Sequence, residues 1–488
     1  SQDEGEERND EVLMKFFGLF QGGDEDSWPE NQTRIIAIND GRLVDFFMEH
    51  KSVFPRLSVV IQDGLAGAPP SHGIAVINLN LRAVVSDPHG GNDSIFERLI
   101  RRMTQEEYWQ ACETCDLKER CYVHHNARSF MDPIAGPKVI ERLKRLYMST
   151  HLRGLLHITL RDLRSALAYM LAGTLDCDGI HSLYNSGNQN GSHIILDGFY
   201  FNAWMSGASV SGDRLIRLLR ELDIGQTNSP DLDRIFGFLE PTAKEMRRFS
   251  FTARGSYDDA LLKKYFTSLP REHSEKTAPE RVAAYQNYVS MVRRRYYFER
   301  RDKGWTGMLP YRNVDRFLNL VILREGDEAA EVNPLILAIN RGEGLSDPSR
   351  LGNKLVLRVR QVDKGTVRSY RLFGGECFSL APLTTNGDGS FVEYLPQRVL
   401  LRYESPTGHH AEMGINLDVY EMLMRLNEGY RPCVEELEGY YLSLSVFKNV
   451  LASAPYQEVL LTETGYDFYR IHRDLKGVLH LEKVQGGA

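Results

Sequence analysis

Residues 34–47, RIIAINDGRLVDFF, decide how the first part of this chain is expected to fold. Residues 35–38 form a short apolar run, which is typical of a strand covered on both faces. Residues 39–41, Asn-Asp-Gly, have turn chemistry. Apolar residues then recur at helical spacing, at Leu43, Val44, Phe46 and Phe47. The segment therefore predicts a buried strand that runs through a turn into a helix.

Asn39 lies at the carboxyl end of this predicted strand. Open α/β sheets bind their ligands at the carboxyl ends of their strands, so a polar side chain held there is a candidate catalytic residue. The alternative is that Asn39 only closes the turn, as asparagine side chains commonly do.

A second apolar segment, residues 74–77, ends in Asn78, Leu79 and Asn80. Together the two segments resemble strands four and five of an AAA+-like P-loop ATPase. The resemblance implies that Asn39 is the sensor-one residue, which contacts the γ-phosphate of ATP and orients the attacking water, with Mg²⁺ as the metal.

The chain has no G-x-x-x-x-G-K-[ST] phosphate loop, and no apolar run ending in paired acids precedes residue 34. An ATPase without these parts has neither a nucleotide anchor nor a magnesium ligand. We therefore expect either the C-terminal portion of a longer ATPase or a degenerate relative.

Length and composition indicate a soluble protein of two or three domains. With 488 residues the chain is too long for one core, and 42% hydrophobic and 26% charged residues are ordinary values. We divide it into a partial nucleotide-binding core with a cysteine cluster (1–150), a helical lid and helical region (151–340) and a C-terminal α+β module (341–488). The net charge of −7 means that any nucleic-acid surface must be local.

Six cysteines and the lack of a long apolar stretch favour a cytoplasmic protein without a membrane partner. Three of the cysteines belong to the motif Cys112-x2-Cys115-x5-Cys121-x2-His124. Two thiolates separated by two residues can bind one zinc ion through a tight turn, and a third cysteine and a histidine can complete a Cys3His site. His124 is preferred over His125 because it repeats the two-residue spacing. The alternative is small buried thiols that only pack.

Residues 151–173 contain the next motif, in which Thr159 and Asp162 have the spacing of a capping box. In AAA+-like ATPases the helical lid often begins in this way, and an arginine near its start, the sensor-two residue, reaches the nucleotide. The resemblance makes Arg161 and Arg164 candidate ATP-binding residues. The alternative is that both arginines face solvent on an ordinary amphipathic helix.

Residues 278–301 predict a helix whose end is basic and aromatic. Its Arg293, Arg294 and Arg295 are candidates for contacts with the phosphates of DNA, with the neighbouring aromatic rings stacking on bases. The alternative is a helix end whose charges complement the helix dipole and whose aromatic residues lie in the core.

Other segments give simpler expectations. Residues 11–21 and 94–110 predict amphipathic helices, the second with Ser94 as N-cap, whereas residues 59–61 and 193–204 have the character of strands. Beyond residue 350 the alternation of apolar and polar residues predicts antiparallel strands. These strands are expected in 354–362, 367–373, 397–405, 459–461 and 478–481, with a glycine-rich turn at 386–390 and helices at 419–427 and 440–452. The predicted fold class is mixed α/β.

The order of these motifs resembles the DptF-type ATPase of restriction systems that depend on DNA phosphorothioation. This resemblance implies a subunit of a multi-protein, DNA-directed defence against phage or unmodified DNA, with sensors, a lid and a partner-binding C-terminal region. A second hypothesis is a non-catalytic scaffold or nucleic-acid-binding subunit with a degenerate ATPase fold.

Overall fold

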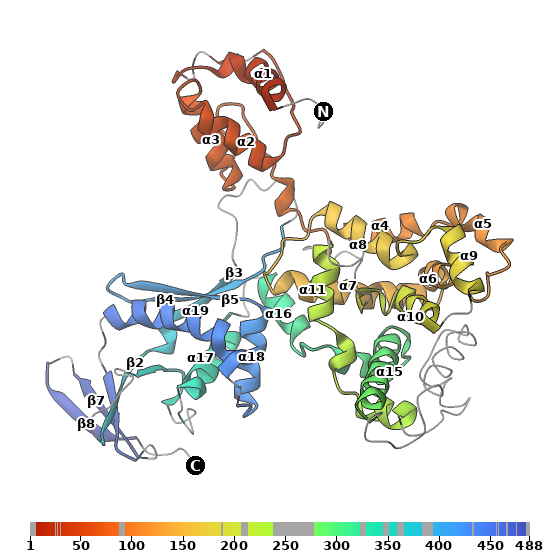
Figure 1. Cartoon of the computed structure of the whole chain (residues 1–488). Coiled ribbons are helices and arrows are strands. Elements are labelled where there is room, and N and C mark those ends of the chain that lie inside the picture. The colour runs from red at the N-terminus through yellow and green to blue at the C-terminus, as the bar shows by residue number, and fades with distance from the viewer. Residues whose placement is uncertain are drawn as a thin grey trace. The chain divides into compact units, whose positions relative to one another are not determined.

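The structure is a computed structural model in which most of the chain is described. The described residues are 6–24, 26, 28–29, 31–86, 93–186, 189–205, 213–237, 278–322, 328–343, 345, 351–358, 366–382, 394–431, 434–454, 456, 458–464, 467–474 and 476–484. They form helices and two antiparallel sheets, so the chain is mixed α/β as predicted (Figure 1). Its contacts divide it into two units, Ser1–Ala83 with Thr384–Leu395, and Val84–Leu383 with Pro396–Ala488.

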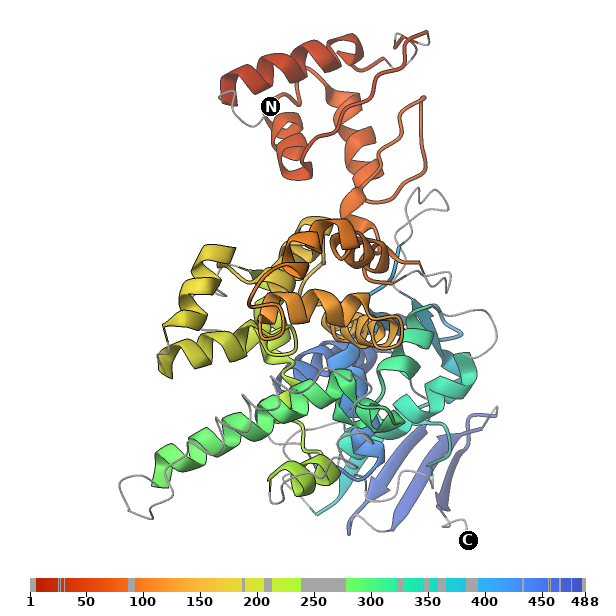
Figure 2. The same ribbon diagram turned by 90° about the vertical axis from the view of Figure 1, so that its right-hand side faces the viewer.

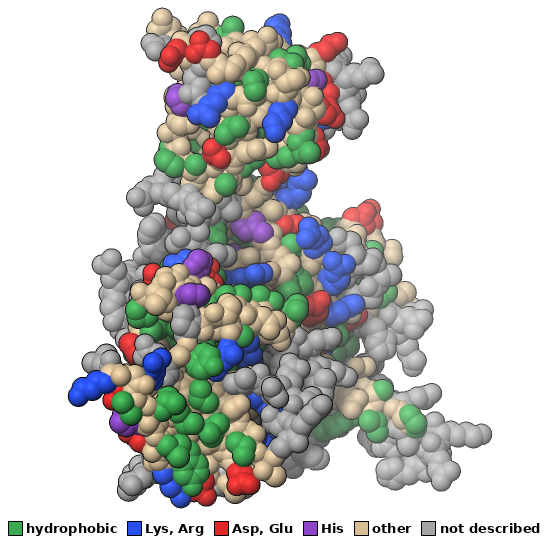
Figure 3. Space-filling view, turned by 90° about the vertical axis from the view of Figure 1, so that its left-hand side faces the viewer, with side chains coloured by type: hydrophobic (Ala, Val, Ile, Leu, Met, Phe, Trp, Pro, Cys, Tyr) green, Lys and Arg blue, Asp and Glu red, His purple; other side chains and the backbone are tan. Residues whose placement is uncertain are grey.

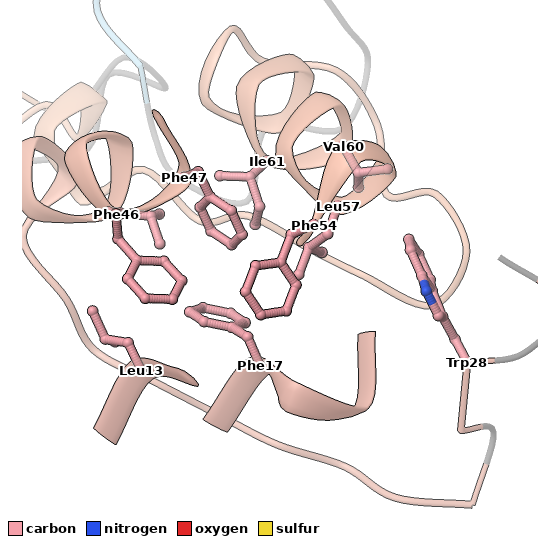
Figure 4. Packing of buried hydrophobic residues seen from close by; sticks show 10 residues of the cluster. Leu13, Phe17, Trp28, Phe46, Phe47, Phe54, Leu57, Val60 and Ile61 are labelled. Atoms are coloured by element: carbon pink, nitrogen blue, oxygen red, sulfur yellow. The ribbon is translucent and has the colours of Figure 1, made fainter. Parts of the chain in front are cut away.

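The first unit is built around three helices. These are α1 (Glu6–Phe17), α2 (Asp40–Glu49) and α3 (Pro55–Leu65), with short 3-10 turns η1 (Gly18–Phe20) and η3 (Leu79–Leu81). Four phenylalanine rings from these helices and the turn between α2 and α3 meet in the core, with ring centroids 5.0 to 6.4 Å apart: Phe17, Phe46, Phe47 and Phe54 (Figure 4). The helical spacing of apolar residues in 11–21 and 43–47 therefore predicted this part of the fold correctly.

The predicted strands of the first unit are wrong. Residues 32–39 have no regular secondary structure and belong to no sheet, and Ile35 is 90% exposed. Residues 75–78 also have no regular secondary structure. Just before them, Ser71 and Ile74 form one isolated β-bridge. A four-residue apolar run becomes a strand only if another strand pairs with its N–H and C=O groups, and the described part of this unit offers none. Residues 59–61 lie inside α3 instead, where Val60 and Ile61 face the core.

Helix α7 (Gly136–Leu152) is the centre of the second unit and is buried along most of its length. Around it lie the other helices of this part of the chain: α4 (Ile95–Met103), η4 (Glu106–Trp109), α5 (Gln110–Glu113), α6 (Tyr122–Met131), α8 (Leu160–Ala172), α9 (Cys177–Asn185), α10 (Gln189–Gly198), η5 (Ala203–Met205), α11 (Arg214–Glu221), η7 (Ile224–Gln226), α12 (Pro230–Leu232), η8 (Asp233–Gly237), α15 (Ala278–Glu299), η9 (Lys303–Met308) and α16 (Val314–Val321). Helices α4 and α11 pack on α7, and so does α15, the long helix in Figure 2. Helix α8 contacts α7 where the hydroxyl of Tyr147 donates to Sδ of Met170.

Local capping signals place two of these helices correctly. Ser94 and Glu97 form a complete capping box at α4, and Thr159 and Asp162 form another at α8. The first helix ends at Met103, earlier than predicted, because a 3-10 turn follows. The strand predicted for 193–204 is wrong, since much of this segment lies in α10 and η5. Its aromatic residues, Phe199, Tyr200 and Phe201, are buried among helices, so their apolar character reflects the core and not a sheet.

The C-terminal part contains both sheets. One has the strand order β1-β2-β6-β7-β8 and the other β3-β4-β5, and all pairs are antiparallel. The strands are β1 (Leu355–Arg358), β2 (Arg368–Phe373), β3 (Phe378–Pro382), β4 (Val399–Glu404), β5 (His410–Ile415), β6 (Glu458–Thr462), β7 (Phe468–Arg473) and β8 (Leu479–Lys483), with the short turn η11 (Gly375–Cys377) and helices α17 (Glu328–Gly342), α18 (Leu417–Asn427) and α19 (Val434–Ser453). The strands and helices predicted here are confirmed among the described residues, whereas residues 359–362 of the first predicted strand lie outside them. The strands β3, β5 and β7 were missed.

Two local features of the C-terminal part connect or end its helices. The buried Asn340 of α17 donates to the carbonyl of Lys354 and accepts from the N–H of Val356, so it connects the helix to β1. Gly429 has a φ of 87°, the left-handed conformation that ends α18 as predicted. Figure 3 shows hydrophobic side chains gathered on the lower part of the face that it views. In the five-stranded sheet, Leu479 and Leu481 of the edge strand β8 are exposed. The predicted turn at 386–390 lies outside the described residues. Among the described residues, no helix is long and apolar enough to cross a membrane.

Candidate functional site

Asn39 is the N-cap residue of α2. Its side-chain oxygen accepts from the N–H groups of Gly41, at 2.9 Å, and Arg42, at 3.4 Å. Asn80 lies beside this cap, because its amide donates to the carboxylate of Asp40 at 2.8 Å. The ends of the two segments predicted as adjacent strands are thus brought together, although neither segment is a strand. The oxygen of Asn39 already binds the helix N-terminus, as the turn-closing alternative expects.

Arg161 and Arg164 lie on the exposed side of α8, next to its capping box. Opposite them, Leu163, Leu167 and Met170 are fully buried. Neither arginine forms an ion pair with any described residue. Their guanidinium groups are therefore directed to solvent.

The neighbouring helices add further arginines. On α4, Arg102 is exposed, and on α11 Arg214 and Arg217 are exposed, again without an ion pair among the described residues. Helix α8 packs against both α4 and α11. We call the exposed arginines of these three helices the arginine surface, which consists of Arg102, Arg161, Arg164, Arg214 and Arg217. Two more arginines of α4, Arg98 and Arg101, lie beside it and pair with Asp93.

The three arginines at the end of α15 face the interior instead. Arg293 contacts Asp233 at 2.7 Å, and Arg295 contacts Glu299 at 3.1 Å. Arg294 makes two bonds to the carboxylate of Asp223, at 2.6 and 2.7 Å. Arg294 and Arg295 are 4% and 1% exposed, and the aromatic residues that follow them are also buried. The structure therefore does not bring this group to the surface.

The buried pair of Arg294 and Asp223 has a clear electrostatic effect. Burial would by itself raise the pKa of the Asp223 carboxyl, but the hydrogen bonds and charge of Arg294 hold that pKa below its usual value. The N–H groups of Gly225 and Trp204 also donate to this carboxylate, at 3.1 and 3.2 Å. Asp223 is therefore ionised and fully paired in the folded protein.

The three clustered cysteines lie in and beside the tight loop between α5 and α6. Cys112 belongs to α5, Cys115 lies in the loop, and Cys121 is the N-cap residue of α6. The N–H of Cys115 donates to the carbonyl of Cys112 at 3.2 Å, and the N–H of Cys121 donates to the carbonyl of Leu117 at 2.8 Å. Leu117 is buried and holds the loop to the core. All three thiols are half-buried, and none of them forms a disulfide.

The ring of His124, the predicted fourth ligand, forms hydrogen bonds with groups other than the cysteines. Its Nδ1 lies 2.8 Å from the carbonyl oxygen of Lys118, so this nitrogen carries the proton. Its Nε2 then accepts from Arg128 at 3.4 Å. Glu113, which pairs with Arg128, lies on the same side of the ring. Both ring nitrogens are thus engaged away from the cysteines.

Helix α9 supplies groups that sequence spacing missed. Nε2 of His181 lies 3.4 Å from Sγ of Cys115, and Nδ1 of His181 lies 3.6 Å from Asp116. These three side chains form one of two described groups whose possible ligand atoms lie within 4.8 Å of one another; the other is Asp10, Glu49 and His50 of the first unit. Spacing could not reveal His181, because it lies 66 residues beyond Cys115.

Comparison with known proteins adds no assignment to these groups. No family model, curated protein or solved structure matches this chain.

Proposed function

We propose that this chain is a nucleic-acid-binding subunit of a DNA-directed defence complex. The observation that carries the proposal is the arginine surface on α4, α8 and α11. Its five guanidinium groups are exposed and form no ion pair with described residues.

The chemistry of these groups fits a phosphate backbone. A guanidinium is permanently charged and donates two parallel hydrogen bonds to phosphate oxygens. In a chain with a net charge of −7, a local group of unpaired arginines is the kind of basic region that a polyanion recognises. The binding expected of such a surface is sensitive to salt and depends little on base sequence, since phosphates carry no sequence information.

The defence context comes from the resemblance to DptF-type ATPases. In this proposal the partners are the other subunits of the complex and DNA, and ATP and Mg²⁺ serve the complex. Arg161 and Arg164 were predicted as nucleotide contacts, and the same exposed geometry supports contact with DNA phosphates.

The test is binding of a fluorescent DNA duplex measured by anisotropy over a range of salt concentrations. We expect the triple variant Arg161→Gln, Arg164→Gln and Arg217→Gln to bind at least about tenfold more weakly and to lower the salt slope by about two to three, because each lost phosphate contact removes roughly one. Its folding stability should change little, since the three side chains are exposed.

The matched control removes the same charge elsewhere. Arg368, Arg402 and Arg473 are exposed arginines on the C-terminal strands, and changing them to Gln should leave the affinity within about twofold. Equal losses in both triple variants would mean only a general effect of net charge. That result, or the absence of salt-sensitive binding by the unmodified protein, would contradict the proposal.

A further inference from the structure

Two helices begin beside the cysteine loop. Cys121 is the N-cap residue of α6, and Cys177 is the first residue of α9, directly after the N-cap Asp176. Both cysteines thus lie at the start of a helix that flanks this loop.

Three contacts hold α9 against the loop. His181 reaches Cys115, and the hydroxyl of Tyr184 accepts from the N–H of Tyr122 at 3.0 Å. The guanidinium of Arg120 lies 5.9 Å from the centre of the Tyr184 ring. Because residues four apart share one side of a helix, Cys177 lies one turn before His181 on the side that faces the loop.

We propose that four cysteine thiols bind one soft metal centre, a zinc ion or an iron–sulfur cluster. The ligands are Cys112, Cys115, Cys121 and Cys177. Cys177 takes the place of His124, whose ring nitrogens are engaged by Lys118 and Arg128. His181 is a positioning residue that orients Cys115, as a group outside the ligand set commonly does.

Both kinds of centre use the same donors. A tetrahedral set of four thiolates is typical of zinc and of iron–sulfur clusters. Among the described residues, no three of these sulfur atoms lie within 4.8 Å of one another. A zinc ion would need them about 3.8 Å apart, given Zn–S bonds of about 2.3 Å, and a cluster would need a wider spacing. The centre would connect α9 to the start of α6.

The experiment measures zinc, iron and acid-labile sulfide in the full chain, purified without oxygen or chelator. We expect about one zinc, or about four irons with sulfide, per chain. Cys177→Ser should lower this content to less than about a tenth, because three remaining thiolates hold the centre poorly. The matched controls are Cys377→Ser, a half-buried cysteine of the C-terminal module, and His124→Gln, and both should keep the metal.

A second measurement on the unmodified protein covers the case in which Cys177→Ser does not fold. Alkylation followed by mass spectrometry should show the four ligand thiols protected together and released together by a strong chelator. Zinc and iron contents separate the two kinds of centre, and either supports the proposal. It is overturned if the protein contains neither metal, if Cys177 reacts equally fast before and after chelation, or if His124→Gln loses the metal while Cys177→Ser keeps it.

Discussion

The arginines at the end of α15 and those of the arginine surface have the same chemistry and opposite environments. Arg294 is 4% exposed and makes two bonds to Asp223, whereas Arg161 and Arg164 are exposed without an ion pair among the described residues. From the sequence, the three consecutive arginines beside aromatic residues were the candidates for DNA contact, whereas Arg161 and Arg164 were candidates for contact with the nucleotide. The comparison teaches that the density of arginines along a chain does not indicate which are available to a ligand.

The difference arises from partners that are distant in sequence. Asp223 lies 71 residues before Arg294, and Asp233 lies 60 residues before Arg293. A further arginine, Arg142 of α7, donates to the carbonyl groups of Tyr297 and Phe298 and fixes the end of α15 to the centre of the unit. The arginines of α15 therefore have structural partners before any ligand is present.

The largest expected effect comes from Arg294→Ala. Removing one member of a buried ion pair leaves the other charge uncompensated, so the free energy of unfolding should fall by about 3–5 kcal/mol. Urea unfolding followed by circular dichroism measures this change. The control Arg164→Ala should stay within about 0.5 kcal/mol of the unmodified protein. Similar losses in the two variants would contradict the contrast between the two environments.

The second expected effect is on the pH dependence of stability. A carboxyl whose folded pKa is lowered, such as Asp223, stabilises the fold fully above about pH 5, and this contribution is lost as the pH falls through about 4 and below. Without Arg294, burial raises the pKa of Asp223, so the folded variant takes up a proton at a higher pH than the unfolded chain.

The loss of stability in Arg294→Ala should therefore be greatest at neutral pH and smaller at about pH 4.5. Unfolding curves of the variant and the unmodified protein at the two pH values test this. An equal loss of stability at both pH values would mean that the loss of Arg294 does not raise the pKa of Asp223.

The smallest expected effect concerns Asn39, which is exposed and whose side-chain oxygen already accepts two hydrogen bonds. Asn39→Ala removes the acceptor for the N–H groups of Gly41 and Arg42 and should destabilise the first unit by about 1 kcal/mol. Asn39→Asp keeps an acceptor and should preserve stability. Thermal unfolding measures both variants, and an unchanged Asn39→Ala would argue against the capping role.

The two variants Asn39→Ala and Asn39→Asp also test the predicted sensor role of Asn39. If the complete defence complex hydrolyses ATP through this residue, Asn39→Asp should lose turnover while it keeps its stability, which a cap alone cannot explain. Phosphate release by the assembled complex measures turnover.

Patterns that depend on near neighbours predicted structure well. The alternation of residues 397–405 predicted β4, and the spacing of Thr159 and Asp162 predicted the start of α8, because both signals act within a few residues. The apolar run at 35–38 predicted a strand wrongly, because such a run becomes a strand only when a second segment pairs with it. No sequence pattern near residue 35 indicates whether the chain contains a second segment that pairs with residues 35–38.

The sequence by itself determined the mixed α/β class, the caps of α4 and α8, several of the C-terminal strands and the short segment that contains Cys112, Cys115 and Cys121. Only the tertiary structure decided which arginines are buried and which are exposed, and only it placed α9, with Cys177 and His181, against that loop. The physical reason is range: caps and alternation act over a few residues, whereas ion pairing and metal ligation join groups that folding brings together from distant parts of the chain.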